Sequence, residues 1–194
     1  MKTEQAAPQA DGRVTKRLAS AYEWISTCIG ALLLLAFVYV FAFRVVSVSG
    51  DSMNNTLRHG DRLLLLSGMF YTPERGDIVV IHYQNEQPLI KRVIAVGGDR
   101  ISIDKKTGLV VLNGTPIEEA YVREGYTPTF EFAGELEVPE GYIFAMGDNR
   151  GDSLDSRSLG AFSEREIVGE VFFRLSPHAG VLRNGDGVYG DQSP

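Results

Sequence analysis

A long uncharged apolar run near the N-terminus constrains the fold of this chain more than any other feature. It covers residues 25–43 and reads ISTCIGALLLLAFVYVFAF. At 1.5 Å rise per residue, a helix of this length spans about 28 Å, close to the bilayer hydrocarbon core of about 30 Å. A cleavable signal peptide has a shorter apolar region, of about 7–15 residues, and ends in small residues, whereas this run ends in Phe41-Ala42-Phe43. We therefore expect one uncleaved transmembrane helix over residues 25–43.

The residues on either side of this run predict how the chain is divided and oriented. Positive side chains precede it at Lys2, Arg13, Lys16 and Arg17, and a positive flank favours the cytoplasmic side of a membrane. We expect residues 1–24 to be a cytoplasmic tail, disordered over the polar residues 1–20. Residues 44–182 then form an extracytoplasmic domain, and residues 183–194 a loose C-terminal tail.

Charge and cysteine content narrow the possible partners. The net charge is −6, and no cluster of lysine and arginine could follow a phosphate backbone, which argues against nucleic acid as a partner. The single cysteine, Cys28, lies inside the apolar run, so no disulfide can form within the chain. A domain of about 150 residues is large enough to fold around its own core without one.

The pattern after Arg44 changes to short apolar runs rich in β-branched residues, which predicts a mainly β domain. Several runs follow a Gly-Asp pair, where glycine supplies a turn and aspartate bonds the backbone ahead of it. Residues 113–140 are richer in Glu, Pro and Gly, and we interpret them as a hairpin or loop insertion. The expected strands are residues 45–48, 62–66, 78–83, 89–96, 100–103, 109–112, 142–146 and 167–175.

The stretch 49–57 follows soon after the apolar run and places the hydroxyl of Ser52 close to a membrane surface. A serine in a loop rich in Gly and Asn is often only a turn residue. As a nucleophile it needs a neighbouring group to take its proton. The chain offers three histidines, His59, His82 and His178, but none stands in a recognisable triad context.

Lys91 is the better candidate for that base. Strand alternation places it on one face with an apolar set, Leu89, Val93 and Ala95. Burial disfavours the charged amine, and a pKa lowered from about 10.4 to about 7–8 would make it a usable base. Arg92 has equally apolar neighbours, but a guanidinium does not give up its proton. The alternative is a strand lysine that extends its amine to water.

Residues 147–157, GDNRGDSLDSR, form the densest polar segment of the chain. Three carboxylates could suggest a calcium loop, but the spacing differs from the EF-hand pattern and no glutamate closes it. Two arginines in the same segment would oppose a cation, and one aspartate could pair with an arginine to hold the loop rigid. The three carboxylates belong to Asp148, Asp152 and Asp155, and the two arginines are Arg150 and Arg157.

Three stretches together resemble the type I signal peptidases, which are membrane-anchored Ser/Lys proteases. They are Ser-Gly-x-Ser-Met-x-x-Thr-Leu at 49–57, Lys-Arg-Val-Ile-Ala-Val-Gly-Gly-Asp at 91–99 and Gly-Asp-Asn-Arg-x-x-Ser-x-Asp-Ser-Arg at 147–157. They occur in the same order as in the family, behind the apolar run. One position departs from the family pattern, because Asn55 stands where the family usually has proline.

The resemblance implies a role for each of five residues. Ser52 is the expected nucleophile and Lys91 the expected general base. Ser153 is expected to hydrogen-bond the lysine amine and orient it. Asp155 and Arg157 are expected to form a supporting salt bridge.

The resemblance also leaves two parts of the site open. The backbone N–H of Ser52 is available as an oxyanion donor. Some family members add a hydroxyl two residues before the nucleophile, where this chain has Gly50, so a second donor cannot be a side chain there. Met53 is expected to line the substrate pocket or to pack in the core.

By this resemblance the chain is a bacterial serine endopeptidase with an exported, signal-peptidase-like β domain behind one transmembrane helix. It would bind the signal peptides of exported preproteins at the lipid bilayer and cut after small-x-small sites such as Ala-x-Ala, through an acyl-enzyme. No metal and no organic cofactor is required. Two alternatives stay open: an inactive or specialised membrane-tethered binding homologue, and a Ser/Lys regulator that cleaves itself.

Overall fold

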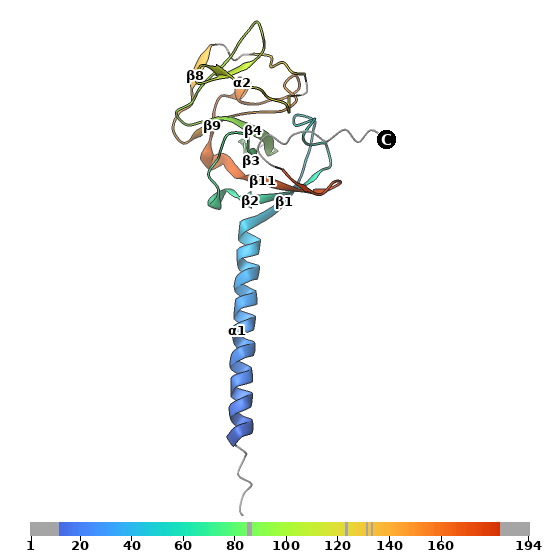
Figure 1. Cartoon of the computed structure of the whole chain (residues 1–194), viewed down its shortest axis with the longest axis vertical. Helices are drawn as coiled ribbons and strands as arrows, with labels where there is room; N and C mark the ends of the chain where they lie inside the picture. The colour runs from blue at the N-terminus through green and yellow to red at the C-terminus, as the bar shows by residue number, and fades with distance from the viewer. Residues whose placement is uncertain (1–11, 85–86, 123, 131, 133, 183–194) are drawn as a thin grey trace, which may run out of the picture. The chain divides into compact units, whose positions relative to one another are not determined.

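The computed structural model describes residues 12–84, 87–122, 124–130, 132 and 134–182, and the chain divides between Phe41 and Ala42 into two compact units (Figure 1). The described part of the first unit is residues 12–41, all of which belong to the helix α1 (Gly12–Ala42). It begins earlier than predicted, since residues 12–20 are helical rather than disordered. Lysine, arginine, leucine and alanine in this segment are all good helix formers. The predicted tail residues 1–11 and 183–194 lie outside the described residues.

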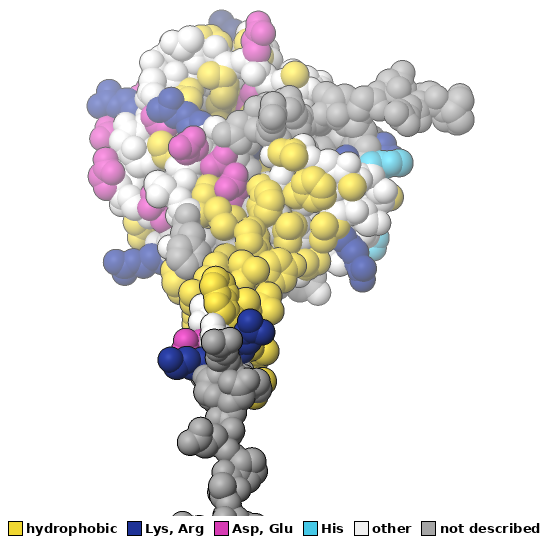
Figure 2. Space-filling model, turned by 60° about the horizontal axis from the view of Figure 1, so that its bottom comes forward, with side chains coloured by type: hydrophobic (Ala, Val, Ile, Leu, Met, Phe, Trp, Pro, Cys, Tyr) yellow, Lys and Arg dark blue, Asp and Glu magenta, His cyan; other side chains and the backbone are white. Residues whose placement is uncertain are grey.

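The surface of α1 is apolar and open. Every described side chain from residue 20 to residue 41 is exposed, and Leu33 keeps 66% of its surface free. Figure 2 shows hydrophobic side chains on the visible face of the helix, beyond the charged ones at its N-terminal end. Among the described residues, Lys16–Ala42 is the one helix long and apolar enough, by length and composition, to cross a membrane.

The second unit is mainly β, and its larger sheet is antiparallel throughout. The strand order is β1-β2-β11-β3-β4-β9-β10, with β12 paired to β11. Phe43, predicted as the last residue of the transmembrane helix, is instead the first residue of β1. The strands are β1 (Phe43–Ser47), β2 (Arg62–Ser67), β3 (Ile78–Ile81), β4 (Leu89–Val96), β9 (Tyr142–Met146), β10 (Phe162–Ser163), β11 (Ile167–Ser176) and β12 (Gly180–Val181).

A smaller antiparallel sheet is inserted between β4 and β9, with the strand order β7-β6-β5-β8. Figure 1 shows β8 at the end of the unit away from β1 and β2. Three short helical segments complete the unit: η1 (Gly68–Phe70), α2 (Ser156–Leu159) and η2 (Glu164–Glu166). The strands of the smaller sheet are β5 (Arg100–Ile103), β6 (Val110–Leu112), β7 (Thr115–Pro116) and β8 (Glu135–Glu137).

All eight runs predicted as strands are strands, and β4, β5 and β9 have the predicted bounds. The strands that the sequence did not reveal are β7, β8, β10 and β12. Each has only two or three residues, too few for an alternation to be seen. The predicted hairpin or loop insertion at residues 113–140 contains β7 and β8.

The core consists of three buried hydrophobic clusters, and β4 contributes to two of them. Val93 packs in one cluster with Val79 and Ile81. Ile94 and Ala95 both pack in another. The pairing of β4 with β9 shifts register between Val93 and Ala95, and this bulge breaks the strand alternation. The prediction that Ala95 shares a face with Lys91 and Val93 is therefore wrong.

This architecture brings three segments together. The β1–β2 connection, residues 48–61, carries the stretch with Ser52. Strand β4 carries Lys91 and lies in the middle of the sheet, between β3 and β9. The polar segment 147–157 follows β9 directly and leads into α2. Segments far apart in sequence therefore meet because β4 and β9 are neighbours.

Candidate active site

Ser52 and Lys91 are in direct contact. Lys91 Nζ lies 2.7 Å from Ser52 Oγ, a hydrogen bond between residues that are 39 positions apart in the chain. Ser52 stands at the start of a tight turn, in which Asn54 N donates to Asp51 O and Leu57 N donates to Met53 O. Ser52 is half-buried, so its hydroxyl is held by the protein and can still be reached from outside.

The Lys91 amine is held in an apolar setting. The residue is only 2% exposed. Burial is the main reason why the pKa of Lys91 falls from 10.5 to about 8. The nearby carboxylate of Asp155 raises this pKa and the guanidinium of Arg157 lowers it, so these two charges largely oppose each other. An appreciable fraction of the amine is therefore neutral near pH 8.

Arg92 binds other residues than its neighbour Lys91 does. Its Nε and Nη2 donate to the two carboxylate oxygens of Asp148, at 2.9 and 2.7 Å, and both side chains are fully buried. The Thr56 hydroxyl donates to the same carboxylate. The Tyr121 ring covers the guanidinium, with the ring centroid 4.0 Å from Cζ. Arg92 therefore joins the polar segment after β9 to the loop that contains Ser52.

The predicted ion pair between Asp155 and Arg157 is present. Arg157 Nε and Nη2 donate to the Asp155 carboxylate at 2.9 and 2.7 Å, and both side chains are buried. Burial alone raises the pKa of Asp155, but the hydrogen bonds and charge of Arg157 outweigh it and leave the pKa lowered. Arg157 Nη1 also donates to the carbonyl oxygens of Arg150 and Pro128, which fixes the segment.

Ser153 differs from its expected role. Its hydroxyl is buried and close enough to the Asp155 carboxylate to help lower the pKa of Asp155, but within the described part of the chain it makes no hydrogen bond of normal geometry, so the expected bond to the Lys91 amine is not made. The hydroxyl instead lies against Gly147. A Cβ at Gly147 would overlap both Ser153 Oγ and the Ser52 carbonyl oxygen. The site therefore needs glycine at position 147.

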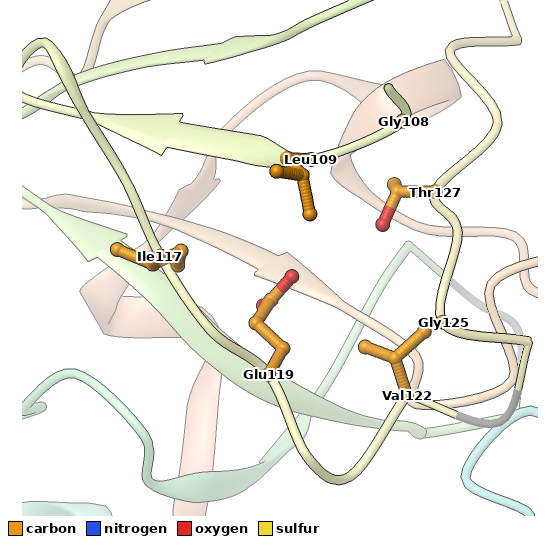
Figure 3. A pocket seen from close by; sticks show the side chains of 7 residues that line it. All are labelled: Gly108, Leu109, Ile117, Glu119, Val122, Gly125 and Thr127. Atoms are coloured by element: carbon orange, nitrogen blue, oxygen red, sulfur yellow. The ribbon is translucent and has the colours of Figure 1, made fainter.

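The sequence did not reveal the role of Glu119, which binds Arg150 of the polar segment. Arg150 Nη1 and Nη2 donate to the Glu119 carboxylate at 2.8 and 2.6 Å, and Nη1 also donates to Thr127 Oγ1. Figure 3 shows the side-chain oxygens of Glu119 and Thr127 at a small cavity of about 40 Å³. A fully buried arginine requires a carboxylate partner, but several acidic residues of the insertion could have supplied it.

A second cavity, of about 120 Å³, lies where β1 ends and β4 begins. Met53 does not line it. Met53 is only 1% exposed and packs in the remaining hydrophobic cluster of the core. Val80 belongs to the same cluster and does line the cavity. The lining residues are Val46, Ser47, Ser49, Val80, Gln87, Pro88 and Ile90.

The alternatives to a Ser/Lys pair receive no support from the geometry. Among the described residues, no histidine hydrogen-bonds to Ser52, and His59 Nδ1 accepts instead from Gly50 N at 3.2 Å. The carboxylates of Asp148 and Asp155 are each bound by an arginine. The described residues contain no group of three or more His, Cys, Asp or Glu that could hold a metal ion.

Known proteins match this chain over most of its length. A family model described as "Signal peptidase, peptidase S26" matches residues 21–176. "Signal peptidase I P" of Bacillus subtilis subsp. natto is 35% identical over 82% of this chain and 93% of that protein. "Signal peptidase I" of Bacillus amyloliquefaciens is 33% identical over 84% and 92%. "Probable signal peptidase I-1" of Synechocystis sp. is 35% identical over 76% and 78%.

A crystal structure of a signal peptidase I from Enterococcus faecalis V583 covers 52% of this chain and 97% of its own, with 25% identity and a TM-score of 0.43. The family and sequence matches define the class of protein: a hydrolase, and within the hydrolases a serine endopeptidase. The chain belongs to the signal peptidase family, peptidase S26.

Proposed function

We propose that this protein removes signal peptides from exported preproteins with Ser52 as nucleophile and Lys91 as general base. The observation that carries the proposal is the 2.7 Å hydrogen bond between Lys91 Nζ and Ser52 Oγ, made by an amine that is 2% exposed. A serine hydroxyl needs a base within hydrogen-bond reach, and a lysine serves only if its amine can be neutral. Burial supplies that condition here.

The reaction proceeds in two halves. The neutral Lys91 amine takes the Ser52 proton as Oγ attacks the scissile carbonyl carbon, and the carbonyl oxygen becomes an oxyanion. The Lys91 ammonium then protonates the leaving amine, the C–N bond breaks, and an acyl-enzyme remains. Water enters, gives its proton to Lys91 and attacks the ester carbon, and Ser52 leaves with that proton. No metal and no organic cofactor takes part in these steps.

The polar segment positions the base. Asp155 and Arg157 pair beside Lys91, where their opposite effects on its pKa largely cancel, so burial remains the main reason why this pKa is lowered. Gly147 allows the segment to lie directly against Ser52.

The substrate would bind as an extended segment along β1. This strand is the last of its sheet among the described strands, so a peptide can add to its open edge. The cavity of about 120 Å³ beside β1 is small and largely lined by apolar side chains, which supports a preference for small-x-small sequences such as Ala-x-Ala. Met53 would affect the shape of this cavity indirectly, because it belongs to the same hydrophobic cluster as Val80 in the cavity wall.

The helix α1 would anchor the protein in a bacterial cell membrane as a single-pass span. Its open apolar surface from residue 20 to residue 41 is suited to lipid. Lys16 and Arg17 near its start favour a cytoplasmic N-terminus, residues 1–24, and an extracytoplasmic catalytic domain, residues 44–182. The bilayer then becomes a second partner beside the signal peptide.

Substitution of Ser52 tests this function. We expect the full chain in detergent to cleave a labelled preprotein with an Ala-x-Ala site, and Ser52→Ala to lose cleavage by at least about 10³-fold. Ser102→Ala, in β5 of the smaller sheet, is the matched control and should cleave like wild type. Equal cleavage by wild type and Ser52→Ala would overturn the proposal. A wild-type chain that binds the preprotein but does not cut it would favour the binding homologue.

A further inference from the structure

Asn149 holds the backbone on both sides of Ser52. Its side-chain Nδ2 donates to Asp51 O at 3.1 Å, and its own backbone N–H donates to Ser52 O at 3.0 Å. The residue is only 4% exposed, so these bonds are protected from water. The bond from the side chain is the one that a substitution can remove.

The side-chain bond helps to fix the direction in which the Ser52 N–H points, together with the Asn54 N–H, which donates to the same Asp51 oxygen at 2.9 Å. The peptide between Asp51 and Ser52 is trans, and in a planar trans peptide the C=O and the following N–H point to opposite sides. Because Asp51 O points to Asn149, the Ser52 N–H points away from it. No described residue accepts a hydrogen bond from this N–H. A free N–H beside a nucleophile is suited to bind a developing oxyanion.

Asn149 is itself held firmly enough to set this direction. Its backbone carbonyl oxygen accepts a hydrogen bond from Asp152 N at 3.1 Å. The preceding residue, Asp148, is bound by Arg92 and by the Thr56 hydroxyl, so the polar segment contacts the serine loop at Asp51, Ser52 and Thr56. Rotation of the Asp51–Ser52 peptide would break the bond to a side chain that cannot easily follow.

Few other donors can replace this N–H. The position two residues before Ser52 is Gly50, which has no side chain, and its N–H already donates to His59 Nδ1 at 3.2 Å. The orientation of the Ser52 N–H therefore decides how well the oxyanion is bound. Loss of one oxyanion donor reduces kcat by about 10²–10³-fold in other enzymes.

We propose that the Asn149 side chain is a positioning group, which aims the Ser52 N–H at the oxyanion of the tetrahedral intermediate by holding Asp51 O. The proposal rests on the proposed role of Ser52 as nucleophile. Asn149 touches neither the substrate nor Lys91 in this account. Its loss should weaken binding of the transition state and leave binding of the substrate and protonation of the base unchanged.

The test compares Asn149→Ala with Asn113→Ala in the full chain. Asn113 is the control, because its side-chain amide, which donates to Asp99 and accepts from Arg100 N, makes its hydrogen bonds in the smaller sheet. We expect Asn149→Ala to reduce kcat by about 10–100-fold, with KM within about twofold and with the same midpoint in the pH profile of kcat/KM. Asn113→Ala should keep the wild-type kcat.

An inhibitor separates positioning from a general loss of structure. Ser52 Oγ adds to the carbon of an Ala-x-Ala peptide aldehyde, its proton passes to Lys91, and the aldehyde oxygen becomes an oxyanion. The Ki of this aldehyde should rise by the same factor as kcat falls. The matching peptide alcohol, which cannot form the adduct, should bind wild type and variant equally. Asn149→Asp, which keeps the size but loses the donor, repeats the test if the alanine variant unfolds.

Two results would overturn the inference: a kcat within about threefold of wild type, or a reduced kcat with an unchanged Ki for the aldehyde. Failure of the proposed function itself gives a different result. In that case the wild-type chain cleaves no better than Ser52→Ala, and no aldehyde adduct forms on either protein.

Discussion

At the scale of single residues, Asn55 departs from the family pattern for a reason that the backbone explains. Its φ is 101°, and Thr56 N donates across the turn to Met53 O at 3.0 Å. A turn with positive φ at its third residue favours glycine or asparagine. Proline, which the type I signal peptidases usually have at this position, has its φ locked near −65°. The turn after Ser52 therefore has its own geometry in this chain.

Substitutions at Asn55 test that geometry. We expect Asn55→Pro to destabilise the protein by about 1–3 kcal/mol, because proline cannot adopt the positive φ, and Asn55→Gly to stay within about 0.5 kcal/mol of wild type. Thermal or denaturant unfolding in detergent measures both. A proline variant as stable as the glycine variant would show that the turn takes the ordinary conformation instead.

The sequence revealed the identities of the main residues but not all of their contacts. Ser52 and Lys91 were singled out by the resemblance to the type I signal peptidases, because the residues alone left a turn serine and a strand lysine that extends its amine to water as alternatives. Asn149 could not be predicted, because its partners are backbone carbonyl oxygens, which every residue has. The bond expected of Ser153 is missing, since whether a hydroxyl meets an amine depends on placement within about 1 Å.

At the scale of elements, the insertion at residues 113–140 is tied to the polar segment after β9. Glu119 and Thr127 bind Arg150, and the Pro128 carbonyl oxygen binds Arg157. The composition of the insertion predicts a hairpin or loop and says nothing of these bonds, because any of its glutamates could pair. The eight predicted strands could be predicted because each lies in an apolar run, whereas β8, although as long as β6, has only one apolar residue, Leu136.

Loss of the Glu119 carboxylate should leave the Arg150 charge buried without its partner. We expect Glu119→Gln to reduce the free energy of unfolding by about 3–5 kcal/mol, because breaking one side of a buried ion pair is costly. Glu118→Gln, an exposed neighbour, is the control and should change it by less than about 0.5 kcal/mol. Denaturant unfolding measures the difference, and equal stability of the two variants would contradict this view of the insertion.

At the scale of the whole molecule, stability should depend on pH through Lys91. Its pKa is about 8 in the folded chain and 10.5 when unfolded, so between these values the unfolded chain binds a proton that the folded chain does not. The contribution of Lys91 to the free energy of unfolding therefore falls as the pH decreases from 10.5 to 8. Below pH 8 this contribution is constant. The change amounts to roughly 3 kcal/mol.

The Lys91→Met variant isolates this contribution. We expect the unfolding free energy of wild type, relative to that of Lys91→Met, to fall by about 3 kcal/mol between pH 10.5 and pH 8. Other titrating groups contribute equally to both proteins and cancel in the difference. A difference that does not change with pH would mean that the amine keeps its ordinary pKa and is not buried.

The central claim is that Lys91 acts as a neutral base on Ser52, and the pH profile of kcat/KM tests it most directly. The measurement uses the full chain in detergent, a preprotein with an Ala-x-Ala site and a pH range of about 5–10. We predict a rising limb with a midpoint near 8 for wild type and no cleavage by Lys91→Met at any pH. A midpoint near 6.5 that survives in Lys91→Met would contradict the account and indicate a histidine base instead.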